Sequence, residues 1–443
     1  MFNTKGFKLP NIFLKIGSTF ILKILGMIFT FGIAMFISRR YGAAAYGEYE
    51  FFISSLKILT IANVWGIDTL LIRECSNIPS ESKKNKDYLF TSIIIVIIGS
   101  ILFNTIFLSV QSYWKALFKV SDLFVLCLVI SIVFWGLTKV LSGYLKAKDK
   151  AWFAILLESN FVPLFTIIIL LSFSDQIEIL VAFNISIFLS LLLGLLYVSR
   201  LINSIKLSLL EFYKSISVKK IQDVLVKSSP FMFISSIVFL NGWISFFTIK
   251  YFLSSSDLGI YSSAFRIMQI IPIPLTVINV ILAPRFSKSY TNGDFDKLKR
   301  YTKIGTTLSI LSTLPILIIC VYFTEDIIVL LWGEAFKAAV PILYILLAAQ
   351  LFNVLCGSVG YLAIMTNHEK FVNKTILIAF ILNFGLNILL IPKIGLIGAA
   401  WGTAIGIVFQ NITLFFYMKR KHGFYALPSY SDLRNTIQEK LIK

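Results

Sequence analysis

Apolar stretches of about 20 residues recur twelve times along this chain, and they constrain its fold more than any other feature. A helix needs roughly 20 apolar residues to cross the hydrocarbon core of a bilayer. Only 14% of the residues are charged, whereas soluble domains average about 25%. Because backbone groups in lipid must find hydrogen bonds within the protein, we expect these stretches to be helices. The sequence therefore predicts an all-α integral membrane protein with about 12 transmembrane helices.

The predicted spans form two sets of six on either side of a basic connector. The first set comprises residues 18–37, 50–67, 89–110, 123–145, 151–173 and 177–198, and the second comprises residues 229–252, 258–283, 304–323, 338–364, 372–391 and 395–418. These sets define the predicted domains: an N-terminal six-helix bundle (1–198), a basic amphipathic cytoplasmic connector (199–228), a C-terminal bundle (229–418) and a cytoplasmic tail (419–443).

Two short motifs recur at about half the chain length and in the same orientation. The motif YGEY at residues 46–49 matches LGIY at 258–261, and GYL at 143–145 matches GYL at 360–362. Parallel repeats of this kind favour two bundles related by an axis along the membrane normal, with the substrate path between them.

The net charge of +19 comes from basic residues that cluster in alternate loops. The tails and even-numbered loops, counted with their flanking helix ends, hold 30 of the 41 basic residues. The positive-inside rule then predicts that both termini are cytoplasmic. The same rule explains the basic charge without nucleic acid, which we do not expect as a partner.

Basic residues within the predicted spans are the strongest functional signal. They are Lys23, Lys57, Lys139 and Arg266, and a charge at mid-membrane costs roughly 2.5–3.5 kcal/mol. Lys139 lies near a helix end, where a lysine can also reach the interface at little cost. We expect Lys23, Lys57 and Arg266 to line a shared cationic cavity, with Gln269 on the face of Arg266. The predicted substrate-binding residues are thus Lys23, Lys57, Arg266, Gln269 and Lys139.

A cationic cavity selects anionic cargo, and phosphate is the group that arginine and lysine bind best. Acidic residues within spans are scarce, and the candidates Glu158 and Asp68 are expected near the cytoplasmic edge. No GxxxxGK[ST] loop for ATP and no metal-ligand spacing of cysteine and histidine occurs in the sequence. We therefore expect a transporter without a catalytic residue, metal or cofactor.

Several longer motifs resemble the bacterial polysaccharide-unit flippases of the Wzx type. They are RRYG through YGEY at residues 39–49, GIDT with Arg73, WGEAF through PIL at 332–343, and NILLIPKIGLIGAA at 387–400. The resemblance covers nearly the whole chain. It places the chain in the wider group that contains multidrug and toxin extruders and lipid II flippases.

The resemblance implies a V-shaped fold of two six-helix bundles that works by alternating access. It implies export of undecaprenyl-pyrophosphate-linked oligosaccharide units across the bacterial plasma membrane, for O-antigen, capsule or another polymer. Membrane lipids and other polysaccharide-assembly proteins, such as a polymerase or a chain-length regulator, are the implied partners. In lipid II flippases, helices 1, 2 and 8 carry lumen cations, which agrees with Lys23, Lys57 and Arg266.

Two alternatives stay open at this point. A drug or metabolite extruder of the same fold would need a deep protonatable carboxylate, and the sequence offers none that is clearly deep. A membrane polymerase or glycosyltransferase would need acid/base residues at a membrane face, often on a large outer loop, and the predicted outer loops are short.

Overall fold

The computed structural model describes residues 9–76, 78–79, 82–173, 176–201, 217–429 and 431. Within these residues every regular element is a helix, and the chain forms two compact units. The first unit comprises Met1–Arg40 and Phe52–Ser236, and the second comprises Tyr41–Phe51 and Ile237–Lys443. An eleven-residue segment of the first long helix, Tyr41–Phe51, thus packs with the second half of the chain.

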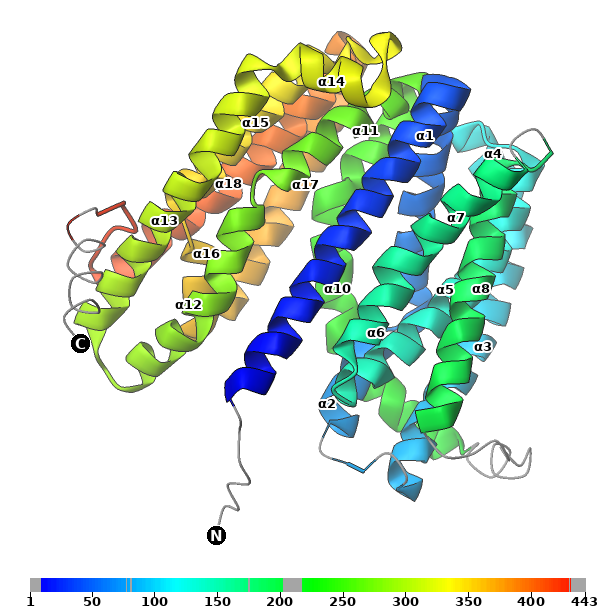
Figure 1. The fold of residues 1–443 in the computed structure, drawn as a ribbon, viewed down its shortest axis with the longest axis horizontal. Coiled ribbons are helices and arrows are strands. Elements are labelled where there is room, and N and C mark those ends of the chain that lie inside the picture. The colour runs from blue at the N-terminus through cyan, green and yellow to red at the C-terminus, as the bar shows by residue number, and fades with distance from the viewer. Residues whose placement is uncertain are drawn as a thin grey trace. The chain divides into compact units, whose positions relative to one another are not determined.

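Figure 1 shows the helices coloured along the chain. The helices before the connector are α1 (Leu9–Val64), α2 (Ile67–Cys75), α3 (Lys83–Ser109), α4 (Gln111–Phe118), α5 (Asp122–Ala147), α6 (Ala151–Ile155), η1 (Leu156–Asn160), α7 (Phe161–Ser172) and α8 (Ile179–Leu201). Those after it are α10 (Val218–Phe252), α11 (Ser255–Ile270), α12 (Ile273–Thr291), α13 (Phe295–Tyr322), α14 (Thr324–Trp332), η2 (Glu334–Phe336), α15 (Ala339–Cys356), α16 (Val359–Met365), α17 (Glu369–Ile394) and α18 (Leu396–His422).

Ten helices in the described ranges are long and apolar enough to cross a membrane, or eleven when the bent pair α11–α12 counts as one span. α1 carries two of the predicted spans, so all twelve predicted spans fall on these helices. The structure confirms an all-α, multi-pass integral membrane protein.

α1 differs from the sequence prediction, which puts a loop between residues 37 and 50. The helix continues through this region and departs from helical geometry only at Gly42, whose φ of 82° and ψ of −179° mark a kink. Glycine adopts a positive φ at little cost because it has no Cβ. Residues 43–49 are therefore helical and available for packing.

The predicted span at 258–283 is broken by its prolines. α11 ends at Ile270 and α12 begins at Ile273, with a bend of 40° between them. Pro272 lacks a backbone donor and ends the first helix, and Pro274 fits the first turn of the second. The break lies just after Arg266 and Gln269, which occupy the last two turns of α11.

The described part of the predicted connector extends the neighbouring helices. Residues 199–201 belong to α8 and residues 218–228 to α10, while residues 202–216 lie outside the described residues. Most of the predicted tail, residues 430 and 432–443, also lies outside them.

Each unit has its own apolar core with hydrogen bonds between helices. In the first unit α5 packs against α2, α3 and α8, and the amide of Asn85 donates to the Tyr144 hydroxyl at 2.6 Å. In the second unit α18 packs against α15 and α17, and Asn387 donates to Ser245 at 2.9 Å. These in-span amides make interhelical hydrogen bonds, as polar groups away from water must.

Candidate functional site

Arg266 lies in a buried ion pair that the sequence analysis does not predict. Its Nε donates to Oε1 of Glu50 at 3.0 Å, and its Nη2 donates to the same oxygen. The Glu50 side chain is 1% exposed and the Arg266 side chain 12%. Both residues belong to the second unit, because Glu50 is in the segment Tyr41–Phe51.

The N-terminus of α11 is fixed by a capping box. The Ser254 hydroxyl accepts from the Asp257 backbone N–H at 3.1 Å, and the Asp257 carboxylate accepts from the Ser254 N–H at 3.0 Å. This pairing satisfies backbone donors that a helix start leaves free. Arg266 follows two and a half turns later, over the ring of Tyr46, with 6.0 Å from its Cζ to the ring centroid.

Two glycines let the Tyr41–Phe51 segment and α11 approach closely. A Cβ added at Gly47 would overlap the carbonyl oxygen of Ser255, and one added at Gly259 would overlap that of Ala43. The two contacts are reciprocal, since Ser255 precedes Gly259 by four residues as Ala43 precedes Gly47. The repeated motifs YGEY and LGIY therefore pack against one another at their glycines.

A third motif borders the same place. α14 ends in Trp332, the chain turns at Gly333 with φ of 99°, and η2 places Phe336 edge-on to Tyr46 with 6.1 Å between the ring centroids. Trp332 and Phe336 are buried. The WGEAF motif thus supports the helix segment that carries Glu50.

Lys139 lies in a second charged cluster, within the first unit. Its Nζ is 3.2 Å from Oε2 of Glu158, while Lys146 Nζ is 2.9 Å from Oε1. The Ser142 hydroxyl donates to Oε1 at 2.5 Å. Residues 139, 142 and 146 are spaced by three and four, so they share one face of α5. The cluster holds two lysines and one carboxylate and therefore keeps one positive charge.

Glu158 lies in the π-helical turn η1, which interrupts the helix between α6 and α7. Such a turn holds an extra residue and changes the direction of the side chains that follow it. Next to it, Asn160 donates to the backbone oxygen of Leu22 at 3.0 Å, and Gly26 leaves room for Ser159. The π-turn therefore contacts α1 next to Lys23.

The other predicted residues have different surroundings. Lys23 on α1 and Gln269 on α11 are exposed, and Lys57 on α1 is half-buried. Lys23 and Lys57 belong to the first unit with Lys139, and Gln269 belongs to the second with Arg266. Arg266 and Lys139 have carboxylate partners in the structure, and the shared cationic cavity stays a prediction.

Glu50 is the residue that sequence reasoning missed. Glu50 stands at the first position of the predicted span 50–67, directly after a predicted loop. The sequence therefore indicates a residue at the end of a helix, near the membrane surface. The helical reading of YGEYE would place Glu50 one turn from Gly47, on the face that carries the repeat motif. That spacing was the available signal.

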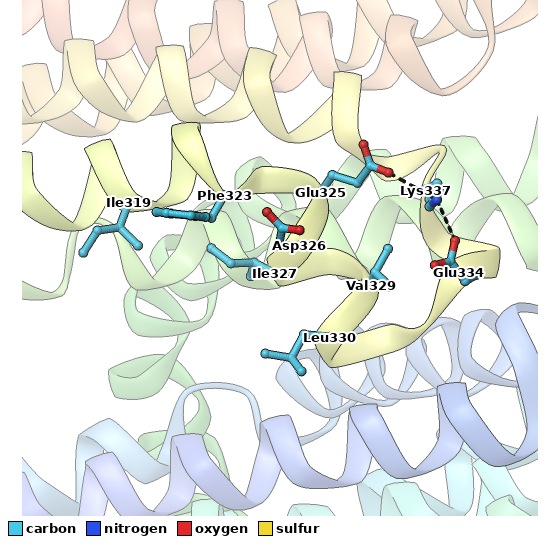
Figure 2. A pocket seen from close by; sticks show the side chains of 9 residues that line it. All are labelled: Ile319, Phe323, Glu325, Asp326, Ile327, Val329, Leu330, Glu334 and Lys337. Atoms are coloured by element: carbon cyan, nitrogen blue, oxygen red, sulfur yellow. Dashed lines mark ion pairs between the residues drawn. The ribbon is translucent and has the colours of Figure 1, made fainter.

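A cavity of about 590 Å³ lies along α14 (Figure 2). Lys337 lies between Glu325 and Glu334, at 3.2 and 2.7 Å. Hydrogen bonds to these carboxylates raise the pKa of Lys337. None of the five predicted site residues lines this cavity, and its exposed ion pairs contribute little to stability.

The two histidines meet although 53 residues separate them. The Thr366 hydroxyl is 3.1 Å from Nδ1 of His368 and 3.4 Å from Nε2 of His422. The same hydroxyl donates to the Leu362 carbonyl oxygen at 2.8 Å. The described residues contain no group of three or more metal-ligating side chains suited to a metal ion.

Comparison with known proteins places the chain among polysaccharide-related membrane proteins. A family model described as polysaccharide biosynthesis protein matches residues 10–290, and one described as MatE matches residues 230–389. The chain is 23% identical over 185 residues to the "Probable low-salt glycan biosynthesis flippase Agl15" of Haloferax volcanii. This match covers 42% of this chain and 39% of that protein. It is also 23% identical over 263 residues to the "Capsular polysaccharide biosynthesis protein CapF" of Staphylococcus aureus. This match covers 59% of this chain and 65% of that protein. The matches thus span less than two-thirds of either relative.

The fold is shared with solved transporter structures. "Lipid II flippase MurJ, inward closed conformation" has a TM-score of 0.72 at 15% identity and covers 92% of this chain and 87% of its own. An inward-facing multidrug resistance MATE family transporter of the MOP superfamily has a TM-score of 0.69 at 13% identity, covering 90% of this chain and 94% of its own. The chain therefore has the fold of these transporters.

Proposed function

Because this chain belongs to the polysaccharide biosynthesis protein family, a family of flippases rather than enzymes, we propose that it moves undecaprenyl-pyrophosphate-linked oligosaccharide units across the bacterial plasma membrane, from the cytoplasmic to the outer leaflet. The family match over residues 10–290 carries this proposal. The names of two relatives, a glycan biosynthesis flippase and a capsular polysaccharide biosynthesis protein, support a glycan as the cargo.

The pyrophosphate is the part of such a substrate that cationic helices recognise. Lys23 is exposed on an apolar helix, where its charge is costly unless an anion or water meets it. Lys57 lies on the same helix, and Lys139 with Lys146 adds one uncompensated positive charge in the same unit. We assign the pyrophosphate to these lysines and give Gln269 a hydrogen bond to the glycan.

Alternating access supplies the movement without ATP. With the inside negative, each negative charge that moves fully outward gains about 2.3 kcal/mol per 100 mV. A pyrophosphate carrying two charges is therefore driven toward the outer leaflet. In this proposal both termini are cytoplasmic, as the distribution of basic residues predicts.

An extruder of drugs or metabolites is the second candidate, since the MatE model matches residues 230–389. Such a transporter needs a carboxylate that exchanges a proton or a cation with its cargo. The buried carboxylate of Glu50 and the partly buried carboxylate of Glu158 both pair with basic side chains in this structure. This arrangement favours the anionic cargo.

The test is a flipping assay with the purified protein in liposomes. An undecaprenyl-pyrophosphate oligosaccharide with a fluorescent sugar is placed in one leaflet, and its loss to a membrane-impermeant quencher is followed. Wild-type protein should accelerate flipping, and Lys23→Gln should slow it at least about tenfold, since a charge-assisted hydrogen bond contributes roughly 1.5–3 kcal/mol. Lys299→Gln, at an exposed lysine near the start of α13, is the control. Wild-type liposomes that flip no faster than protein-free ones would overturn the proposal.

A further inference from the structure

The Arg266–Glu50 pair holds two helices of the second unit together at the repeat motifs. Glu50 lies three residues after Gly47, and Arg266 seven residues after Gly259, so each charge shares a helix face with a glycine at the crossing. We infer that Arg266 is a positioning residue that, through Glu50, fastens the segment Tyr41–Phe51 of α1, and that it does not contact the pyrophosphate. This inference rests on the proposed flippase function.

The geometry gives Arg266 a partner of its own inside the protein. Two guanidinium nitrogens, Nε and Nη2, donate to one carboxylate oxygen of Glu50. Turning the guanidinium to a pyrophosphate would leave Glu50 charged and 1% exposed. An uncompensated buried charge costs more than one charge-assisted hydrogen bond gains. The pair is also electrically neutral, so it adds nothing to a cationic surface that attracts an anion.

The close approach of the two helices at Gly47 and Gly259 explains why an ion pair is needed to fix their packing. The backbones approach so closely that neither Gly47 nor Gly259 has room for a methyl group. Small contact faces bury little apolar surface, and the hydrogen-bonded pair supplies the specific contact that fixes how the helices cross. Tyr46 extends this contact, since it packs beside both the guanidinium and the ring of Phe336.

The segment is a short part of a longer helix whose other parts belong to the first unit. Gly42 kinks α1 at one end of the segment, and Lys57 lies seven residues beyond Glu50, on the same helix face. The segment and Lys57 thus belong to the same helix, α1. Arg266 acts on substrate binding through α1 in this way.

A double-mutant cycle separates positioning from contact. The variants are Glu50→Gln, Arg266→Gln and the double variant, each purified and tested for thermal unfolding and for flipping of the undecaprenyl-pyrophosphate oligosaccharide. Each single variant leaves one buried charge without its partner, so we expect a lower unfolding midpoint and at least tenfold slower flipping. The double variant has no buried charge at this site, and we expect its flipping to return to within about threefold of wild type.

A direct contact between Arg266 and the substrate gives the opposite pattern. The double variant would then flip as slowly as Arg266→Gln, while Glu50→Gln would keep near-normal flipping because Arg266 is intact. That result, or additive losses of stability in the double variant, would overturn the inference. If the wild-type protein flips no substrate, the proposed function fails, while the unfolding midpoints alone still show whether the two charges act as a pair.

Discussion

Two carboxylates, Glu50 and Glu158, pair with basic residues of the predicted spans and so determine where positive charge is left to bind an anion. Glu50 pairs with Arg266, and Glu158 pairs with Lys139 and Lys146. A charged group inside a membrane protein is tolerated where a partner of opposite charge meets it. The first pair is neutral, whereas the second cluster keeps one positive charge. Electrostatic attraction of an anion is therefore expected at the second cluster and at Lys23.

Replacing Glu158 with glutamine should destabilise the first unit. Lys139 and Lys146 would keep their charges on one face of α5 without the carboxylate that lies within 3.2 Å of both. We expect the free energy of unfolding to fall by roughly 1–3 kcal/mol, the usual cost of leaving a partly buried polar group unpaired. Thermal unfolding in detergent measures this change. Glu178→Gln, at an exposed carboxylate, is the matched control, and equal midpoints for the two variants would contradict the expectation.

The cost of burying charge identified Arg266 and Lys139 from the sequence, but it did not identify their partners. Glu50 is 216 residues from Arg266 along the chain, and nothing in a single sequence states which distant residues meet. The sequence predicts that Glu158 lies near the membrane edge, but its pairing with Lys139 depends on the π-turn η1, which has no clear sequence signature. The choice of residues was predictable, and their pairing required the fold.

Two of the helix breaks lie at Gly42 and Pro272, and hydrophobic periodicity alone does not predict a break at these positions. Pro272 ends α11, although hydropathy predicts one continuous span at 258–283. Gly42 kinks α1, although hydropathy predicts a loop between residues 37 and 50. The number of apolar stretches was predictable because membrane thickness sets their length. The helix between residues 37 and 50 was not, because its polar residues resemble a loop.

The crossing of the Tyr41–Phe51 segment and α11 should not tolerate a side chain at its glycines. In Gly47→Ala the new methyl group would overlap the carbonyl oxygen of Ser255, so the helices must separate and lose the contact that Glu50 and Arg266 make. We expect a loss of at least about 2 kcal/mol of stability, as overpacking a tight contact causes. Less than half of the Gly47→Ala protein should then remain folded at the temperature of the wild-type unfolding midpoint.

The control for this substitution is Gly385→Ala in α17. A Cβ there meets nothing within 4 Å, and alanine favours a helix interior over glycine by roughly 0.5–1 kcal/mol. The two substitutions add the same methyl group to a helical glycine, so they should shift the unfolding midpoint in opposite directions. A Gly47→Ala midpoint at or above that of Gly385→Ala would show that the crossing is not close-packed.

The distribution of the basic residues predicts the orientation of the whole molecule in the membrane. Tyr113 on α4 is 80% exposed in a loop predicted to face outward, and Asn292 is exposed in a basic loop predicted to be cytoplasmic. In intact cells a membrane-impermeant maleimide should label Tyr113→Cys, and it should label Asn292→Cys only after permeabilisation. All four native cysteines are buried, and burial raises the pKa of Cys75 to about 11, so the background should be low. The reverse labelling pattern would invert the topology.

A flippase that carries a pyrophosphate without a coupled ion should respond to membrane potential. Since each charge gains about 2.3 kcal/mol per 100 mV, two charges gain about 1.4 kcal/mol at 30 mV, which is a tenfold change in the distribution between leaflets. A lipid-linked oligosaccharide with one phosphate and one charge should change only about threefold at the same potential. The measurement uses liposomes in which a potassium gradient and valinomycin set the potential, and a quencher reads the distribution at equilibrium. Reversing the gradient should reverse both effects, because the force acts on the charge of the cargo. A distribution that ignores the potential would mean that a cation moves with the substrate and neutralises it, and the uncoupled mechanism would then be wrong.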